Sequence, residues 1–239
     1  MEFLVVLKRD CETCQLVEPV LAELRGEFPL TLYSQDDPTF PEGLGGALDD
    51  TSLEKSWRLG VDTVPTLVRI ENGQEVSRTQ GWDCAEWVRV TGIKTLGEGL
   101  PPFQPGCGSI SVEPGMPERL ALKFGALTLE SRVIEVDEMD DPAEIAYDQG
   151  WTDGLPIIPP TDLRIARMLT GTTRDSGEIL GAIPPNLIDC TIEKAAVNAV
   201  MAGCRPEYFP VVLATVEAAL KPEFSMHGLL ATLWFSGPV

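Results

Sequence analysis

The amino-terminal part of the chain alternates between apolar runs of strand length and segments with helical spacing. Residues 3–7, FLVVL, form a continuous apolar run, which is typical of a strand buried on both faces. Apolar residues then recur at three-and-four spacing over 16–24, which predicts a one-sided helix that Pro19 should kink. Residues 28–36 follow as a second strand, and residues 51–60 as a short helix with a Ser or Thr cap.

The clearest local signal is a β-hairpin over residues 64–82. Two runs rich in strand-forming residues flank Asn72-Gly73, the favoured dipeptide of a tight two-residue turn. A short helix over 83–92 follows, and the turn-rich residues 37–50 should form an irregular insertion. The resulting order predicts a mixed central sheet covered by helices.

A change of composition predicts a domain boundary near residue 95. The segment 95–109, TLGEGLPPFQPGCGS, is rich in glycine and proline, as linkers are. We therefore expect an α/β domain over residues 1–94, a linker over 95–109 and an α+β domain over 110–239.

The second domain has fewer sequence signals. We expect strands within 127–136, a helix capped by Thr161, and a helical hairpin from segments 191–203 and 205–221. The chain ends on HGLLATLWFSGPV with no polar tail, which predicts that the second domain continues beyond residue 239.

Charge and apolar content restrict the protein's partners and compartment. The chain has 239 residues and a formal net charge of -19, which argues against binding nucleic acid or anionic membranes. No stretch approaches the roughly 20 apolar residues that span a bilayer. The amino terminus has only a five-residue apolar run and lacks the basic segment of a secretory signal, so we expect a cytoplasmic protein. Its 6 cysteines are then expected to be reduced, catalytic or buried.

Cys11 and Cys14 form a CxxC pair at the predicted start of the first helix. At this spacing an exposed Cys11 could act as the thiolate nucleophile, and Cys14, one turn later, could attack the resulting mixed disulfide. The neighbouring Glu12 should disfavour the thiolate. Two alternatives remain: half of a zinc site, which would need about four ligands, or inert packing.

Residues 1–92 resemble the thioredoxin-like family. The match rests on CETC between a buried strand and a helix, Pro19 five residues after Cys14, Val64-Pro65-Thr66 opening a strand, and the Asn72-Gly73 hairpin. The resemblance implies that Pro65 is cis and faces the dithiol, and that Val64 pairs with the substrate backbone.

The chain departs from the family pattern at several positions. Asp10 replaces the usual tryptophan, Glu12-Thr13 replaces Gly-Pro, Val5 replaces a buried acid, and the family's first strand and helix are absent. Proton handling is therefore open, and we expect a reductant with a potential near thioredoxin's, roughly -270 mV.

The second half loosely resembles uncharacterised bacterial proteins associated with thioredoxin domains or small selenocysteine-containing partners. The matching segments are WTDGLPIIPPT, EKAAVNAVMAGCRPEYFPVVLATVEA and FSMHG. This resemblance gives a grouping and no mechanism.

Five further residues are candidates for chemistry. Cys107, between glycines, and Cys204, beside an arginine, could take a secondary redox role. Trp151, Asp153 and His227 could form a second-domain site. The alternatives are a linker cysteine without a role for Cys107, a packed cysteine for Cys204, tryptophan packing for Trp151, and a buried, hydrogen-bonded His227. A chain with one histidine lacks the ligands of a multi-histidine metal centre.

The sequence thus predicts a thiol–disulfide oxidoreductase. Cys11 attacks, Cys14 resolves, and Val64 and Pro65 position the substrate chain, which is a protein disulfide or the C-terminal domain itself. The expected electron donor is a thioredoxin-reductase-type protein or a small thiol, and the exchange implies neither cofactor nor metal. The alternatives are a non-redox docking module and a zinc-stabilised interaction protein.

Overall fold

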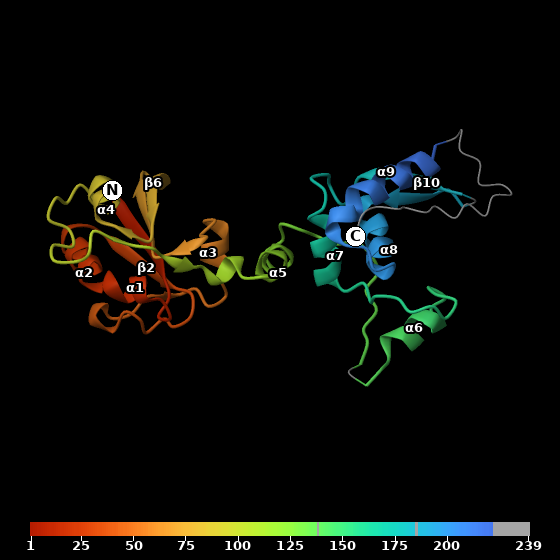
Figure 1. Cartoon of the computed structure of the whole chain (residues 1–239), viewed down its shortest axis with the longest axis horizontal. Coiled ribbons are helices and arrows are strands. Elements are labelled where there is room, and N and C mark those ends of the chain that lie inside the picture. Colours follow the sequence, from red (N-terminus) through yellow and green to blue (C-terminus); the bar gives the residue numbers. More distant parts are fainter. Residues whose placement is uncertain (138, 185, 222–239) are drawn as a thin grey trace. The chain divides into compact units, whose positions relative to one another are not determined.

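The computed structural model describes residues 1–137, 139–184 and 186–221. The chain divides into two compact units, Met1–Phe124 and Gly125–Val239, which are described separately (Figure 1). His227, the FSMHG segment and the predicted continuation of the second domain lie outside the described residues.

The first unit is built on a five-stranded mixed sheet. Its order is β3-β2-β1-β5-β6. β1 pairs in parallel with β2 and β2 with β3, whereas β1–β5 and β5–β6 are antiparallel. The strands are β1 (Glu2–Leu7), β2 (Leu30–Ser34), β3 (Leu48–Asp49), β5 (Thr66–Glu71) and β6 (Gln74–Gln80). The predicted mixed sheet with helices is confirmed.

β1 is the middle strand, and the residues from Phe3 to Leu7 are all buried. Because successive side chains point to opposite faces, both faces of the sheet must be covered. Helices α2 (Glu18–Glu27) and α4 (Cys84–Thr91) contribute buried residues to the same core.

The kink predicted at Pro19 is a break between two helices. α1 (Glu12–Leu16) ends before Val17, and Pro19 lies in the first turn of α2. There its missing N–H leaves no helical carbonyl without a donor.

The hairpin over 64–82 is confirmed as β5 and β6. Asn72 and Gly73 take positive φ angles of 51° and 77°, which the tight turn requires. Its register is continuous except for a bulge between Arg69 and Ile70.

The helix predicted over 51–60 forms as α3 (Glu54–Arg58), but the expected Ser or Thr cap is wrong. Leu53 occupies the cap position without a side-chain hydrogen bond. The Asp50 carboxylate instead accepts the backbone N–H groups of Lys55 and Ser56 at 2.8 and 2.9 Å.

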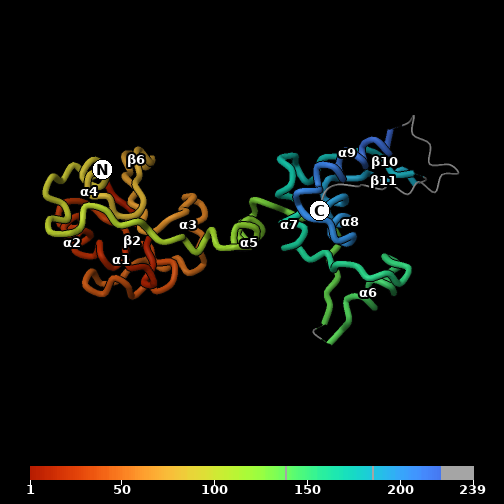
Figure 2. Tube along the Cα trace, in the orientation of Figure 1, coloured from red at the N-terminus to blue at the C-terminus, as the bar shows by residue number. Residues whose placement is uncertain are grey.

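Residues 95–109, expected as a linker, pack against the first unit. β8 (Phe103–Gln104) pairs with β7 (Trp82–Asp83), and β9 (Cys107–Gly108) pairs with β4 (Thr63–Val64). Leu96 is 1% exposed. In Figure 2 the yellow-green trace of this segment crosses the unit before reaching α5 (Met116–Lys123). The glycine and proline residues of this segment allow it to pack closely against the rest of the first unit.

The second unit is mainly helical. Its core includes Ile165, Met168, Ile192, Ala196 and Phe209. The helices predicted after Thr161 and within 191–203 and 205–221 are confirmed, whereas the β10–β11 hairpin was not predicted. The elements are α6 (Pro142–Asp148), α7 (Asp162–Leu169), β10 (Ile179–Ile183), β11 (Ile188–Thr191), α8 (Ile192–Met201) and α9 (Phe209–Ala219).

The strands expected within 127–136 are wrong, because no regular element forms there. The buried Glu193 carboxylate accepts the backbone N–H groups of Glu130 and Ser131, so these donors bond to a side chain and not to a strand. Across residues 1–137, 139–184 and 186–221, no helix combines the length and apolarity needed to cross a bilayer.

Candidate functional site

The loop that carries the CxxC pair is fixed by one carboxylate. Asp36, just after β2, accepts the backbone N–H groups of Arg9 and Asp10 at 2.8 and 3.0 Å. Because β1 and β2 are parallel, their carboxyl ends meet at one edge of the sheet. Burial raises the pKa of Asp36, but these two hydrogen bonds, together with those from Ser34 and Asp37, outweigh it and hold the pKa below its usual value.

Cys11 and Cys14 lie side by side at the start of α1. The Sγ of Cys11 accepts the backbone N–H of Cys14 at 3.3 Å, so Cys11 acts as the cap of this helix. The Cys11 thiol donates to the carbonyl oxygen of Val64 at 3.6 Å, and the Val64–Pro65 peptide bond is cis, as expected.

Both thiols are buried, which corrects the expectation of an exposed Cys11. Cys11 is 3% exposed and Cys14 is 0% exposed. The reason is tertiary: residues 103–111, which we call the covering segment, pack against the dithiol loop and against β4.

Cys107 belongs to the covering segment and contacts Cys11. In the antiparallel β4–β9 pair, Cys107 is the register partner of Val64. Its thiol and its backbone N–H lie close enough to the Cys11 sulfur to lower the pKa of that thiol. The expected flexible linker cysteine is therefore a half-buried member of a three-thiol cluster.

The covering segment fits closely on its upstream side. Thr13 donates its hydroxyl to the carbonyl of Pro105 at 2.6 Å. A Cβ added to Gly106 would collide with the Thr63 side chain and lie 2.7 Å from the Val64 carbonyl oxygen. Only glycine permits this approach of the two backbones.

A buried polar network holds the downstream side. The Gln35 amide donates to Ser109 at 2.6 Å and to Ser56 at 2.8 Å, and its oxygen accepts the Ile110 N–H at 3.0 Å. Ser111 donates to the Val61 carbonyl at 2.9 Å. Each buried polar side chain thereby gains a partner, as a stable interior requires.

The pKa of Cys11 is lowered to about 5. The largest cause is a hydrogen bond from the Cys14 thiol, followed by those from the Cys107 thiol and the backbone N–H groups of both residues, which together outweigh burial. This reverses the expected effect of Glu12, because donors in direct contact with sulfur act more strongly than an exposed carboxylate.

The other two thiols shift in the opposite direction. Burial raises the pKa of Cys14, and the hydrogen bond to Cys11 raises it further. Burial and Cys11 likewise raise the pKa of Cys107, although the Lys8 charge lowers it. These shifts favour a thiolate at Cys11 and protonated thiols at Cys14 and Cys107.

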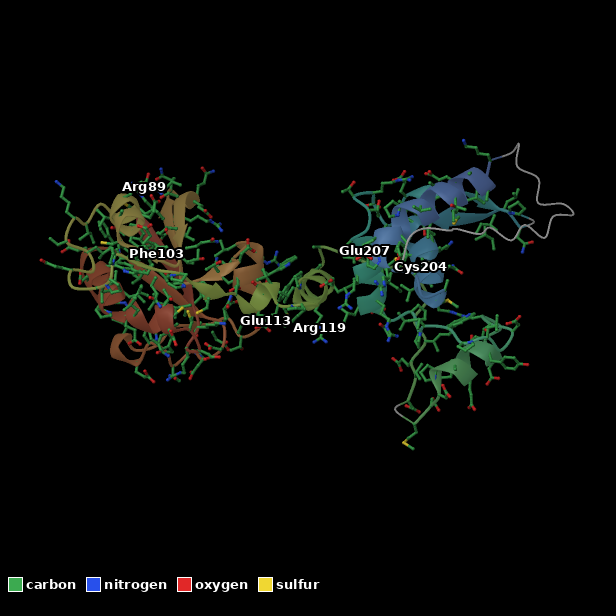
Figure 3. All side chains as sticks on the ribbon, viewed as in Figure 1. Arg89, Phe103, Glu113, Arg119, Cys204 and Glu207 are labelled. Carbon is green, nitrogen blue, oxygen red and sulfur yellow. The ribbon has the colours of Figure 1, made fainter. Side chains whose placement is uncertain are left out.

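The second-unit candidates lie at separate places. Trp151 lines an apolar cavity of about 1280 Å³, which Asp153 does not line. Asp153 accepts a long hydrogen bond, 3.4 Å, from the Leu155 N–H. Cys204, labelled in Figure 3, lines a smaller cavity of about 210 Å³ together with Arg164. These residues do not converge on one site.

The described residues show no cluster of metal ligands, and no known family model matches the chain. Within the part of the chain that the structure describes, no group of three or more His, Cys, Asp or Glu residues is arranged to hold a metal ion. No protein-family model matches the chain, and comparison with curated proteins finds no significant match.

Sequence reasoning missed Asp36 and Gln35, and it misjudged the environment of Cys107. Asp36 carried a usable signal, because it follows the second strand and parallel strands bring their ends together. The sequence around Gln35 gave no such signal, since its hydrogen-bond partners Ser56 and Ser109 lie 21 and 74 residues away in sequence.

Proposed function

We propose that the protein catalyses thiol–disulfide exchange, with Cys11 as nucleophile and Cys14 as resolving thiol. The observation that carries the proposal is the place of the Cys11 sulfur at the start of α1, where it accepts the Cys14 backbone N–H at 3.3 Å and where Cys14 and Cys107 lower its pKa to about 5. Such surroundings stabilise a thiolate, the reactive form in exchange.

We infer a thioredoxin-like fold for residues 1–92. The parallel β1–β2 pair, the antiparallel β5–β6 hairpin and the cis Val64–Pro65 bond beside Cys11 support it. The Cys11–Val64 contact also supports a role for Val64 and Pro65 in positioning a substrate chain.

The proposed reaction has two exchange steps. The Cys11 thiolate attacks a disulfide of the substrate protein, a mixed disulfide forms, and one substrate sulfur leaves as a thiolate. Cys14 then loses its proton and attacks Cys11 Sγ, which releases the second substrate thiolate. Two electrons pass from the dithiol to the substrate, and a dithiol protein or small thiol returns them.

The resolving step is helped by the first step. Once Cys11 is in a disulfide its negative charge is gone, and with it the contribution of that charge to the raised pKa of Cys14. Burial of Cys14 remains and keeps the thiolate costly, so the resolving step is expected to be the slower one.

The test is catalysed reduction of a protein disulfide with dithiothreitol as the electron donor. Cys11→Ser should lower the rate to that of dithiothreitol alone. Cys84→Ser is the matched control, because Cys84 lies in the same unit and bonds to the Leu96 carbonyl. Wild-type rates in Cys11→Ser would overturn the proposal.

The docking alternative is favoured by one observation, the 3% exposure of Cys11. A protein disulfide reaches this sulfur only if the covering segment moves. A docking module would keep its binding function in the Cys11→Ser and Cys14→Ser variants, whereas an exchange enzyme would lose its activity. The remaining alternative, a zinc-stabilised interaction protein, is tested by measuring the zinc content of the purified protein.

A further inference from the structure

The covering segment already pairs with Val64, the residue that the proposed function assigns to positioning a substrate chain. Val64 is the residue beside the Cys11 sulfur, and its backbone is already paired with that of Cys107. The pairing is antiparallel and brings a thiol of the same chain to the reactive sulfur. The first unit therefore contains a resident thiol at the site of exchange.

We propose that Cys107 is a third redox-active residue, which exchanges with Cys11 to give a Cys11–Cys107 disulfide within the chain. The step rests on the proposed function, which supplies the Cys11–Cys14 disulfide by reducing a substrate. The Cys107 thiolate attacks Cys11 Sγ, the Cys11–Cys107 bond forms and the Cys11–Cys14 bond breaks. Cys14 leaves as a thiolate and takes up a proton equivalent to the one that Cys107 lost, so no further oxidant is needed.

Two features allow Cys107 to compete with Cys14 for the Cys11 sulfur. Cys14 is fully buried, whereas Cys107 is half-buried and faces the positive charge of Lys8. Desolvation therefore opposes the Cys14 thiolate more strongly than the Cys107 thiolate. Either thiol can then resolve a mixed disulfide at Cys11, and the two internal disulfides interconvert.

The arrangement also limits access to Cys11. Thr13 and Gly106 hold the covering segment against the dithiol loop and β4, so an external disulfide competes with Cys107 for the same sulfur. Formation of the Cys11–Cys107 bond would close the site covalently.

The experiment is peptide mapping of oxidised Cys14→Ser, in which Cys11 has lost its nearest partner. The protein is oxidised with glutathione disulfide, with reduced glutathione kept at about 0.1 mM, below the ~1 mM effective concentration of a tethered group. After acid quenching and alkylation, trypsin should give residues 10–25 linked to residues 95–119. This linked pair should exceed the glutathione adduct of Cys11.

The opposite distribution overturns the inference: Cys11 carrying glutathione while Cys107 is alkylated. Cys14→Ala repeats the test without a buried hydroxyl, in case the serine variant fails to fold. Gly106→Ala, added to Cys14→Ser, should lower the ratio of link to adduct about tenfold. Gly108→Ala is the matched control, because a Cβ at Gly108 meets nothing within 4 Å.

Failure of the proposed function would look different. Cys107→Ser leaves Cys11 and Cys14 in place, so their disulfide should still form within residues 10–25. If it does not form, the exchange function itself is contradicted. If it forms while Cys14→Ser gives no link, only the role of Cys107 is contradicted.

Discussion

The low pKa of Cys11 has one cause that the CxxC spacing provides and one that it does not. The Cys14 thiol, the largest cause, and the Cys14 N–H are three residues away, whereas Cys107 lies 96 positions further along the chain. Donors beside a sulfur favour the thiolate at a pH where an ordinary thiol is neutral.

The first residue-scale prediction concerns the pH dependence of alkylation. Since the pKa of Cys11 is lowered to about 5, its thiolate fraction should be high at neutral pH and fall as the pH drops through that value. The rate of iodoacetamide modification, followed on the peptide of residues 10–25, should show this midpoint. The unfolded protein in urea is the control, with a midpoint near the ordinary ~8.5. The same midpoint in both states would contradict the assignment.

Removing the donors should raise that midpoint. Cys14→Ala removes the largest contribution to the low pKa of Cys11, and Cys107→Ala removes a smaller one. The alkylation midpoint should therefore move upward in both variants, and further in Cys14→Ala. Equal midpoints in wild type and both variants would show that these thiols do not stabilise Cys11.

The reduction potential of the Cys11–Cys14 pair should depend on how strongly the Cys11 thiolate is stabilised. A stabilised thiolate favours the reduced dithiol, so we expect the Cys11–Cys14 pair to be more oxidising than thioredoxin, above roughly -270 mV. This reverses the expectation based on Glu12. Equilibration with a dithiothreitol series, with Cys107→Ser to isolate the pair, measures the potential. A value at or below thioredoxin's would restore the sequence-based expectation.

At the scale of elements, the covering segment joins β4 and β7 through short strands and a buried polar network. Its placement depends on backbone contact at Gly106. Gly106→Ala should therefore destabilise the folded protein by about 1–3 kcal/mol, the usual cost of overpacking. Urea unfolding measures it, and Gly108→Ala should remain at the wild-type midpoint. Equal urea midpoints for Gly106→Ala and Gly108→Ala would mean that Gly106 is not in tight contact with Thr63 and Val64.

Gln35 makes the second element-scale prediction. Gln35→Ala leaves Ser56 and Ser109 without their common partner and the Ile110 N–H without an acceptor. The expected loss in the free energy of unfolding is about 1–3 kcal/mol. Gln74→Ala at the exposed start of β6 is the control. A loss no greater than that of the control would mean that water replaces the network.

Elements whose turn or helix cap depends on neighbouring residues could be predicted from the sequence. The β5–β6 hairpin depends on Asn72-Gly73, and α8 on the Thr191 hydroxyl, which accepts the Lys194 N–H. The cap of α3 was misread because Asp50, five and six residues before Lys55 and Ser56, accepts their N–H groups. Residues 127–136 were misread because Glu193, 62 positions beyond Ser131, satisfies backbone donors there. The pattern within residues 127–136 carries no information about a partner that far away.

At the scale of the whole molecule, all residues of the proposed site lie in the first unit, Met1–Phe124. Residues 1–124 produced alone should therefore fold and keep the low pKa of Cys11. Cooperative unfolding and an alkylation profile equal to that of the full chain would agree. A fragment cut after residue 94 serves as a comparison and should show a higher alkylation midpoint, because it keeps Cys14 but lacks the contribution of Cys107. If both fragments kept the full-chain profile, the covering segment would have no part in the site.

The sequence by itself determined the mixed sheet, the helical segments and the CxxC pair at the start of the first helix, because these depend on periodicity and on residues close in the chain. Only the tertiary structure decided that residues 95–109 are part of the first unit. Their partners, Val64, Trp82 and Gln35, lie between 22 and 74 positions away. The same long-range pairing buries Cys11 and places Cys107 beside Val64, because it supplies partners for backbone and buried polar groups that no neighbour in the sequence supplies.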